Sequence, residues 1–197
     1  MNWLTHIFLS DPDIEFRLGN LLADLVKGPD RSGMSAPFLR GIERHQMIDA
    51  FTDSHPLVHR SRARIGGDYR LVTGILVDVF YDHFLAIDWD RYASEPLEAF
   101  TACLYTDVRA HTIVLPEPAR AALDQMISEH WLESYRQIEG IQSSLRRVSL
   151  RLSARVGEKF ALEKAVSELL TNFDGLKEDF AEFFPTLQAH VRESTHA

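Results

Sequence analysis

The stretch "IERHQMIDAFTDSHP", residues 42–56, decides how the chain is interpreted. His45, Asp49 and Asp53 are spaced four residues apart, so a helix would place their side chains on roughly one face. Neighbouring apolar residues such as Ile48 give the same segment a side that can face a core. We therefore expect an imidazole and carboxylates to lie beside the core of a helical protein.

The size and composition are those of an ordinary globular protein. The chain has 197 residues, of which 45% are hydrophobic and 25% are charged. Such a chain can bury a sizeable core without disulfides, and we expect a single domain over residues 1–197. The single cysteine excludes an internal disulfide framework and fits a reducing compartment.

Charge and hydropathy restrict the location and the partners. The first residues lack a basic segment, and no uncharged apolar run approaches the roughly 20 residues of a membrane span. We therefore expect a cytoplasmic protein with no membrane span. The formal net charge of −8 disfavours non-specific binding to nucleic acid or anionic lipid.

Apolar residues recur with helical spacing along most of the chain, whereas the alternating pattern of strands is scarce. The pattern predicts an all-α, single-domain helical bundle. The expected helices cover residues 13–28, 36–54, 56–65, 68–89, 94–115, 117–137, 141–157 and 173–194.

Two other predicted helices repeat the spacing of the opening stretch. "GNLLADLV" carries Asn20 and Asp24, and "LVDVFYDHFL" carries Asp78 and Asp82 with His83 adjacent. Their neighbours are mostly apolar, and a buried carboxylate without a partner costs several kcal/mol.

A shared divalent cation would explain these acids, because such ions take carboxylate and imidazole ligands from facing helices. Hard oxygen ligands favour manganese or magnesium over zinc. Each residue also has an ordinary structural interpretation. Asp53 could cap a helix, Asp24 could pair with a basic residue, and His6 in "WLTHIFLS" could be a packed core histidine.

Four separated blocks suggest a family. "MNWLTHIFLS", "GNLLADLVKG", "GIERHQMIDAFTDSHP" and "LVDVFYDHFL" closely resemble, in this order, blocks of the bacterial acyl carrier protein phosphodiesterases, also called acyl carrier protein hydrolyases. The later "SEHWLESYRQIEGIQSSLRRVSLRL" is similar to the downstream region of that family.

The resemblance implies an activity and a cofactor. The family removes the 4′-phosphopantetheine arm from holo-acyl carrier protein and leaves the apo form. It is manganese-dependent and is placed in the helical HD phosphohydrolase superfamily, with magnesium as the alternative ion here. The implied metal ligands are His6, Asp24, His45, Asp49, Asp78 and Asp82, and the implied catalytic residues are Asp24, His45, Asp49 and His83. The chain departs from the superfamily in one respect, because it contains no His-Asp dipeptide.

The implied partner is strongly acidic, so an enzyme with a net charge of −8 needs a local basic face to bind it. Arg60, Arg62 and Arg64 follow the His/Asp helix, and Arg147, Arg151 and Arg155 are spaced four apart as a basic ridge. The alternative for both clusters is a solvated face paired with glutamates.

Two other functions stay open on the sequence alone. The first is a metal phosphohydrolase for a free nucleotide or a small phosphate ester, whose basic residues would line the pocket. The second is a non-enzymatic helical scaffold, whose acids would be caps and salt bridges and would bind no metal.

Overall fold

The computed structural model describes residues 1–66, 69–157 and 160–195, with the side chains of residues 155 and 195 outside this description. No strand occurs in these ranges, so the prediction of an all-α protein is confirmed. The α-helices are α1 (Trp3–Phe8), α2 (Ile14–Leu22), α3 (Ala36–Ser54), α4 (Pro56–Arg64), α5 (Thr73–Ile87), α6 (Leu97–Ala110), α7 (Glu117–Ser128), α8 (Trp131–Ser134), α9 (Ile138–Val156), α10 (Val166–Thr171) and α11 (Phe173–Thr195). Short 3₁₀ turns lie at η1 (Gly28–Gly33), η3 (Trp89–Arg91) and η4 (Leu162–Ala165).

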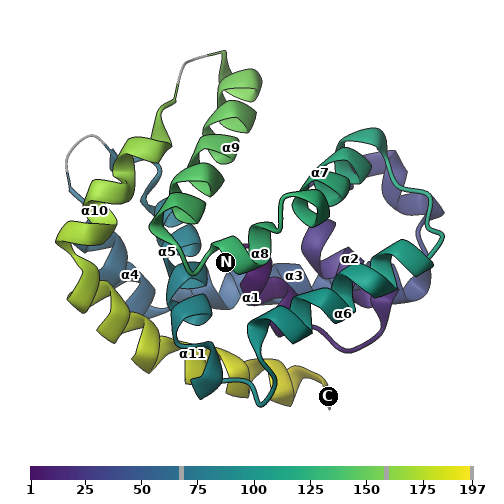
Figure 1. Ribbon diagram of the computed structural model, residues 1–197, viewed down its shortest axis with the longest axis horizontal. Helices are drawn as coiled ribbons and strands as arrows, with labels where there is room; N and C mark the ends of the chain where they lie inside the picture. The colour runs from purple at the N-terminus through teal and green to yellow at the C-terminus, as the bar shows by residue number, and fades with distance from the viewer. Residues whose placement is uncertain (67–68, 158–159, 196–197) are drawn as a thin grey trace.

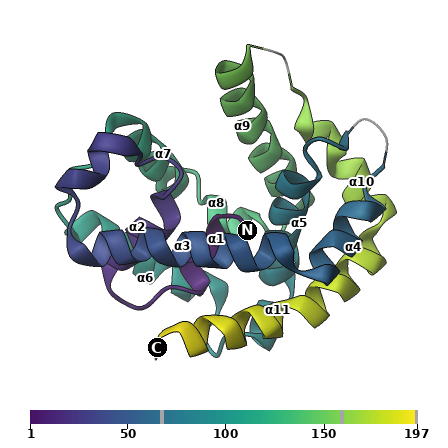
Figure 2. The same cartoon turned by 180° about the vertical axis from the view of Figure 1, so that it is seen from behind.

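The longest helices set the shape of the molecule. α3 runs along the long dimension, and α11 follows one edge of the molecule (Figures 1 and 2). α9 rises from the body on one side of α8, and α7 lies on the other side (Figure 1). In the described part of the chain, no helix has both the length and the apolar character that crossing a membrane requires.

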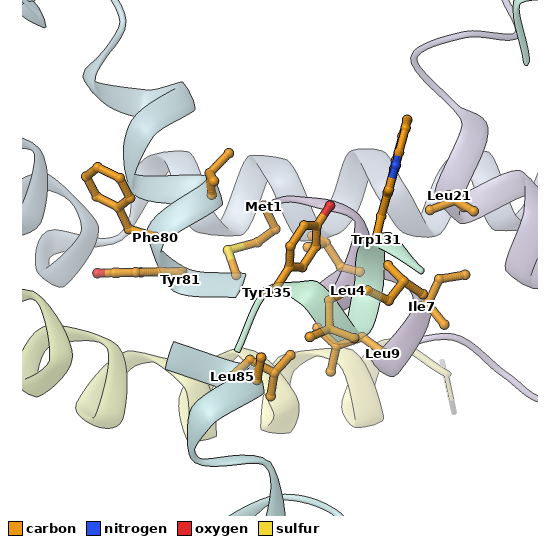
Figure 3. Close-up of a cluster of buried hydrophobic side chains, with 14 of the residues drawn as sticks. Met1, Leu4, Ile7, Leu9, Leu21, Phe80, Tyr81, Leu85, Trp131 and Tyr135 are labelled. Carbon is orange, nitrogen blue, oxygen red and sulfur yellow. The ribbon is translucent and has the colours of Figure 1, made fainter. Parts of the chain in front are cut away.

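α5 supplies much of the core, as its apolar sequence predicts. Phe80, Tyr81 and Phe84 are fully buried, and Phe84 and Tyr81 contact Phe180 of α11. Figure 3 shows Phe80, Tyr81 and Leu85 among the buried side chains that fill the space between the helices. The continuous hydrophobic character of this helix follows from its burial on several sides.

The pairing of α2 with α3 depends on two glycines. A Cβ atom at Gly19 would lie 2.0 Å from the main-chain oxygen of Phe38, and one at Gly41 would lie 2.1 Å from the main-chain oxygen of Phe16. No side chain fits at either position, because the two backbones themselves are in contact. This approach brings the main chain of α2 within reach of side chains on α3.

Most predicted helices are present, but several boundaries differ. The segment 36–54 matches α3, whereas the helix expected over 13–28 ends at Leu22. Arg31 donates hydrogen bonds to the main-chain oxygens of Ala23 and Val26, and these bonds stabilise a turn where the helix was expected to continue.

Two further predicted helices are shorter than expected. The segment 117–137 divides into α7 and α8 at His130, whose φ of 51° is left-handed. The segment 68–89 begins at a position outside the described residues, and its described part is helical from Thr73 in α5. The more specific prediction of an HD phosphohydrolase arrangement stays a prediction.

Candidate active site and metal centre

Two imidazoles and a carboxylate meet at one point. His6 of α1, His45 of α3 and Asp49, one turn later on α3, each offer a ligand atom, and these atoms lie within 4.8 Å of one another. The Nε2 atom of His45 is 3.1 Å from Oδ2 of Asp49, and the Nε2 atom of His6 is 3.3 Å from Oδ1 of Asp49. The helical spacing of four residues therefore places His45 and Asp49 next to each other on α3, as the sequence predicted.

Asn20 of α2 fixes both rings. The rings of His6 and His45 are stacked with centroids 4.0 Å apart. The Nδ1 atom of His6 lies 2.9 Å from Oδ1 of Asn20, and the Nδ1 atom of His45 lies 2.7 Å from the main-chain oxygen of Asn20. The amide nitrogen of Asn20 donates to the main-chain oxygen of His6 and to Ser10, so its Oδ1 must face His6.

These contacts determine where the protons lie. Both partners at Asn20 are acceptors, so the Nδ1 atom of each ring carries a proton and Nε2 is the atom that faces Asp49. Burial, together with the neighbouring His45, lowers the pKa of His6 to about 4, so its ring is neutral near pH 7. The Nε2 atom of His6 is buried and makes no hydrogen bond to any described residue.

A lone pair directed at a carboxylate is unfavourable unless a cation lies between them. The donor set of two imidazole nitrogens and a carboxylate oxygen therefore fits a divalent metal. Burial by itself would raise the pKa of Asp49, but the α-ammonium of Met1, 3.0 Å away, lowers it. Asp49 is thus a carboxylate at neutral pH, as a metal ligand must be.

The cluster opens into a cavity of about 580 Å³, lined by residues of α1, α2, α3, α5 and α9. Asp78 of α5 lies in its wall, and the α-ammonium of Met1 is 3.3 Å from Asp78 and 3.0 Å from Asp49. Burial would lower the pKa of this ammonium, but Asp78 and Asp49 raise it to about 10. Burial in turn raises the pKa of Asp78, against the effect of the ammonium.

Asp24 lies at the mouth of the cavity, and its environment differs from the prediction. It was expected among apolar residues within a helix, but α2 ends before it and its side chain is 77% exposed. Its Oδ2 atom is 4.0 Å from Nε2 of His45, and its Oδ1 atom is 3.9 Å from Nζ of Lys27. Asp24 and Asp78 therefore line the cavity but lie outside the tight cluster of ligand atoms.

Comparison with known proteins identifies the family of the chain. The family model described as acyl carrier protein phosphodiesterase matches residues 1–187. The chain belongs to this family. The resemblance seen in the four sequence blocks is thereby confirmed, and the chain is classed as a phosphoric diester hydrolase.

Several relatives with the same name match this chain over almost their full length. An acyl carrier protein phosphodiesterase of Yersinia pestis is 32% identical over 200 residues, which cover 100% of this chain and 98% of the relative. One of Salmonella dublin is 34% identical over 194 residues, with 97% of each chain covered. One of Photorhabdus laumondii is 32% identical over 189 residues, which cover 94% of this chain and 92% of the relative. No solved structure gives a significant match.

Two residues that the family resemblance implied for the site lie elsewhere in this family member. Both carboxylate oxygens of Asp82 accept hydrogen bonds from the start of α1, at 2.8 Å from the Leu4 nitrogen and 2.6 Å from the Thr5 hydroxyl. His83 directs its Nδ1 atom at the main-chain oxygen of Tyr135, 2.7 Å away. The structure therefore does not bring Asp82 and His83 to the cluster of His6, His45 and Asp49 or into the cavity wall, and the predicted roles of Asp82 as a ligand and of His83 as a catalytic residue gain no support.

The arginines predicted to bind the partner lie in different environments in the structure. Arg60 and Arg64 both bind Asp179 of α11, which is fully buried, and Arg62 pairs with Asp53. The other predicted cluster lies on α9. Arg147 stacks over Trp131 at 3.8 Å, Arg151 is exposed and lines the cavity, and the side chain of Arg155 is outside the described residues.

The sequence analysis missed the role of Asn20. Its position in an apolar helix marks it as a buried polar residue, but only the packing of α2 on α3 shows that it contacts both imidazoles. The position of Lys27 in the cavity wall was also missed, because Lys27 was expected inside a helix that instead ends at Leu22.

Proposed function

We propose that this protein hydrolyses the phosphodiester that joins 4′-phosphopantetheine to the serine of holo-acyl carrier protein, and that it uses a divalent metal, with Mn²⁺ as the expected ion. The observation that carries the proposal is the convergence on Asp49 of the Nε2 atoms of His6 and His45, two histidines that line an open cavity. The name of the family supplies the substrate.

His6, His45 and Asp49 would hold the ion, and Asp24 and Asp78 are close enough to contact substrate or solvent around it. A bound divalent ion neutralises charge on the phosphate oxygens and lowers the pKa of a coordinated water. Two imidazole ligands favour a transition metal such as Mn²⁺ over Mg²⁺, which prefers oxygen ligands.

Two carboxylates are placed to move protons. Asp24 is exposed at the cavity mouth, where its carboxylate accepts a proton from the water that attacks phosphorus. Asp78 is a buried acid in the cavity wall, and burial raises its pKa, so of the two carboxyl groups it is the better suited to deliver a proton to the serine oxygen when the P–O bond breaks. The products are free 4′-phosphopantetheine and the apo-protein with its serine hydroxyl restored.

Positive charge at the cavity mouth matches the substrate. Lys27 and Arg151 line the same cavity as the cluster. Their charges attract the phosphodiester and the acidic surface of the carrier protein. This local charge offsets the net charge of −8 on the whole chain.

The proposal is tested by incubating the purified protein with holo-acyl carrier protein and Mn²⁺ and measuring intact mass. We expect the carrier protein to lose the mass of the phosphopantetheine group, and the His45→Ala and Asp49→Ala variants to release none while keeping helical circular dichroism. His83→Ala is the matched control, because His83 is a histidine of the same chain that lies outside the cavity. Equal turnover by His45→Ala and wild type at saturating Mn²⁺ would disprove the assignment of the site. Turnover of a small phosphate ester without turnover of the carrier protein would favour the alternative substrate.

A further inference from the structure

A second pocket opens beside the metal centre. It has a volume of about 370 Å³ and lies between α7 and α9, next to α8. Figure 1 shows α8 between these two helices. The two pockets share Asn2, Trp3, Leu25 and Arg151 in their walls, so they lie directly next to each other.

The walls of this second pocket are largely apolar. Ala121 and Ala122 of α7 and Leu150 of α9 line it, and Leu150 is 66% exposed although it is a large apolar residue. An exposed leucine at the entrance of an apolar pocket is typical of a binding site for a partly apolar ligand.

The floor of the pocket is polar. The hydroxyl of Tyr135 is surrounded by the side chains of Ser144, Asn2 and Arg147, and Tyr135 is only 2% exposed. In Figure 3 the rings of Tyr135 and Trp131 stand between the side chains of Met1 and Leu21.

Two donors on this floor lack acceptors. The Nδ2 atom of Asn2 and the Nη2 atom of Arg147 are buried and make no hydrogen bond within the described part of the chain. The guanidinium of Arg147 lies 3.8 Å over the ring of Trp131, which fixes its plane. Buried donors of this kind are costly unless a ligand or solvent supplies acceptors.

We propose that the second pocket binds the pantetheine part of the substrate, with its amide carbonyls accepting hydrogen bonds from Asn2 and Arg147. This inference rests on the proposed function. The phosphate would lie in the first pocket, beside the metal ligands, and the arm would pass the shared wall at Trp3 and Leu25.

The chemistry of the arm fits this path. Pantetheine carries a gem-dimethyl group and methylene segments, which suit the alanine and leucine walls, and two amides, whose carbonyls suit the unpaired donors. The arm is uncharged beyond its phosphate. An uncharged arm with polar amides needs a neutral pocket with a few directed donors.

The test measures ligand binding instead of turnover. Ala122→Phe fills the pocket, and Arg147→Met removes the buried donor but keeps an unbranched apolar stem. The matched controls are Ala102→Phe, at an exposed position of α6, and Arg146→Met, at the exposed neighbour on α9. Calorimetry would give the Kd of 4′-phosphopantetheine and of inorganic phosphate for each Mn²⁺-loaded variant, and the Kd of Mn²⁺ itself.

We expect Arg147→Met to weaken the binding of 4′-phosphopantetheine by about ten-fold, the factor that one lost buried hydrogen bond gives, and Ala122→Phe to weaken it at least as much, because the added ring occupies the pocket. Their Kd values for inorganic phosphate and Mn²⁺ should equal those of wild type, and the two control variants should bind all three ligands normally. An unchanged Kd for phosphopantetheine in both pocket variants would overturn the proposal. An equal loss for inorganic phosphate would also overturn it, because the pocket would then act on the phosphate alone.

A second ligand separates the arm from a fatty acyl group. If the variants weakened only S-acylated phosphopantetheine and not the free thiol, the pocket would hold the acyl chain and the proposal would be wrong. If the proposed function itself were wrong, a different result would be observed. In that case wild type would leave the mass of holo-acyl carrier protein unchanged, whatever the binding of the free arm.

Discussion

The Nδ1 atom of His45 on α3 lies 2.7 Å from the main-chain oxygen of Asn20 on α2. Because the acceptor is the main chain, this contact depends on how closely the two helices approach, and the contact between their backbones at Gly19 and Gly41 sets that distance. The orientation of one metal-site ring therefore follows from the packing of two helices, and the other ring is held by the side chain of the same asparagine.

Replacement of Asn20 by leucine should weaken metal binding. The variant removes the acceptor for Nδ1 of His6, while the main-chain acceptor for His45 remains. Loss of such a supporting hydrogen bond typically costs about 10- to 100-fold in metal affinity. Calorimetric titration with Mn²⁺ measures the effect. Ser10→Ala is the control, because Asn20 would still donate to the main-chain oxygen of His6, and its Kd should stay close to that of wild type. A wild-type Kd for Mn²⁺ in Asn20→Leu would show that metal binding by His6 does not depend on its hydrogen bond to Asn20.

Gly41→Ala should lower both the stability and the metal affinity. The added methyl would lie 2.1 Å from the main-chain oxygen of Phe16, so α2 and α3 must separate. Overpacking of this kind costs about 1–3 kcal/mol, and contact between backbones places the expected loss near the upper value. Urea unfolding measures the stability. Gly33→Ala is the matched control, since a Cβ there would meet no described atom within 4 Å. Equal stability of the two variants would contradict the proposed role of the glycines.

The sequence predicted the helices and the central pair of ligands better than it predicted the whole site. His45 and Asp49 could be paired from their spacing, because α3 is a regular helix through both residues. The same rule did not predict the environment of Asp24, since hydrogen bonds from Arg31 to Ala23 and Val26 hold a turn at this residue in place of the expected helix. It also failed for Asp82, because the partner that explains its burial is the backbone of α1, which is distant in sequence.

Asp179 should stabilise the fold in a pH-dependent way. Burial alone would raise the pKa of Asp179, but the hydrogen bonds from Arg64, Ser61 and Arg60 outweigh burial and lower it. A carboxyl group with a pKa below its unfolded value stabilises the protein above that unfolded value, and the stabilisation is lost as the pH falls through the folded pKa. Asp179→Asn should therefore unfold more easily at neutral pH, by about 3–5 kcal/mol, and the difference from wild type should shrink in acid.

The measurement for Asp179 is urea unfolding of the metal-free protein from neutral pH to below pH 4, where the unfolded carboxyl titrates. Asp53→Asn is the control, because Asp53 pairs with Arg62 but is 65% exposed. Exposed ion pairs contribute about 0–1 kcal/mol, so this variant should stay near wild type. A constant difference between Asp179→Asn and wild type at every pH would exclude the carboxylate as the source of the effect.

Charge reversal on α9 should reduce the reaction with the carrier protein more than it reduces the hydrolysis of a small phosphodiester. Of the arginines predicted to bind the partner, Arg60 and Arg64 hold Asp179, so reversing either would test folding instead of docking. Arg151 is exposed at the junction of the two pockets, where an acidic protein must approach. Arg151→Glu should lower kcat/KM for holo-acyl carrier protein by about ten-fold or more, equal to about 1.4 kcal/mol.

The control for Arg151→Glu is Arg192→Glu, an exposed arginine of α11 that lies outside the two pockets. Kinetics for both variants would be measured with both substrates over a series of salt concentrations at saturating Mn²⁺. Salt screens charges on the rim of an interface, so the wild-type reaction with the carrier protein should slow as salt rises, and Arg151→Glu should show a weaker dependence. The small phosphodiester carries one negative charge and has no carrier protein to dock, so its reaction should depend less on salt than the reaction with the carrier protein. If Arg151→Glu reduced both substrates equally, Arg151 would act on the phosphate alone, and the docking surface would have to lie elsewhere.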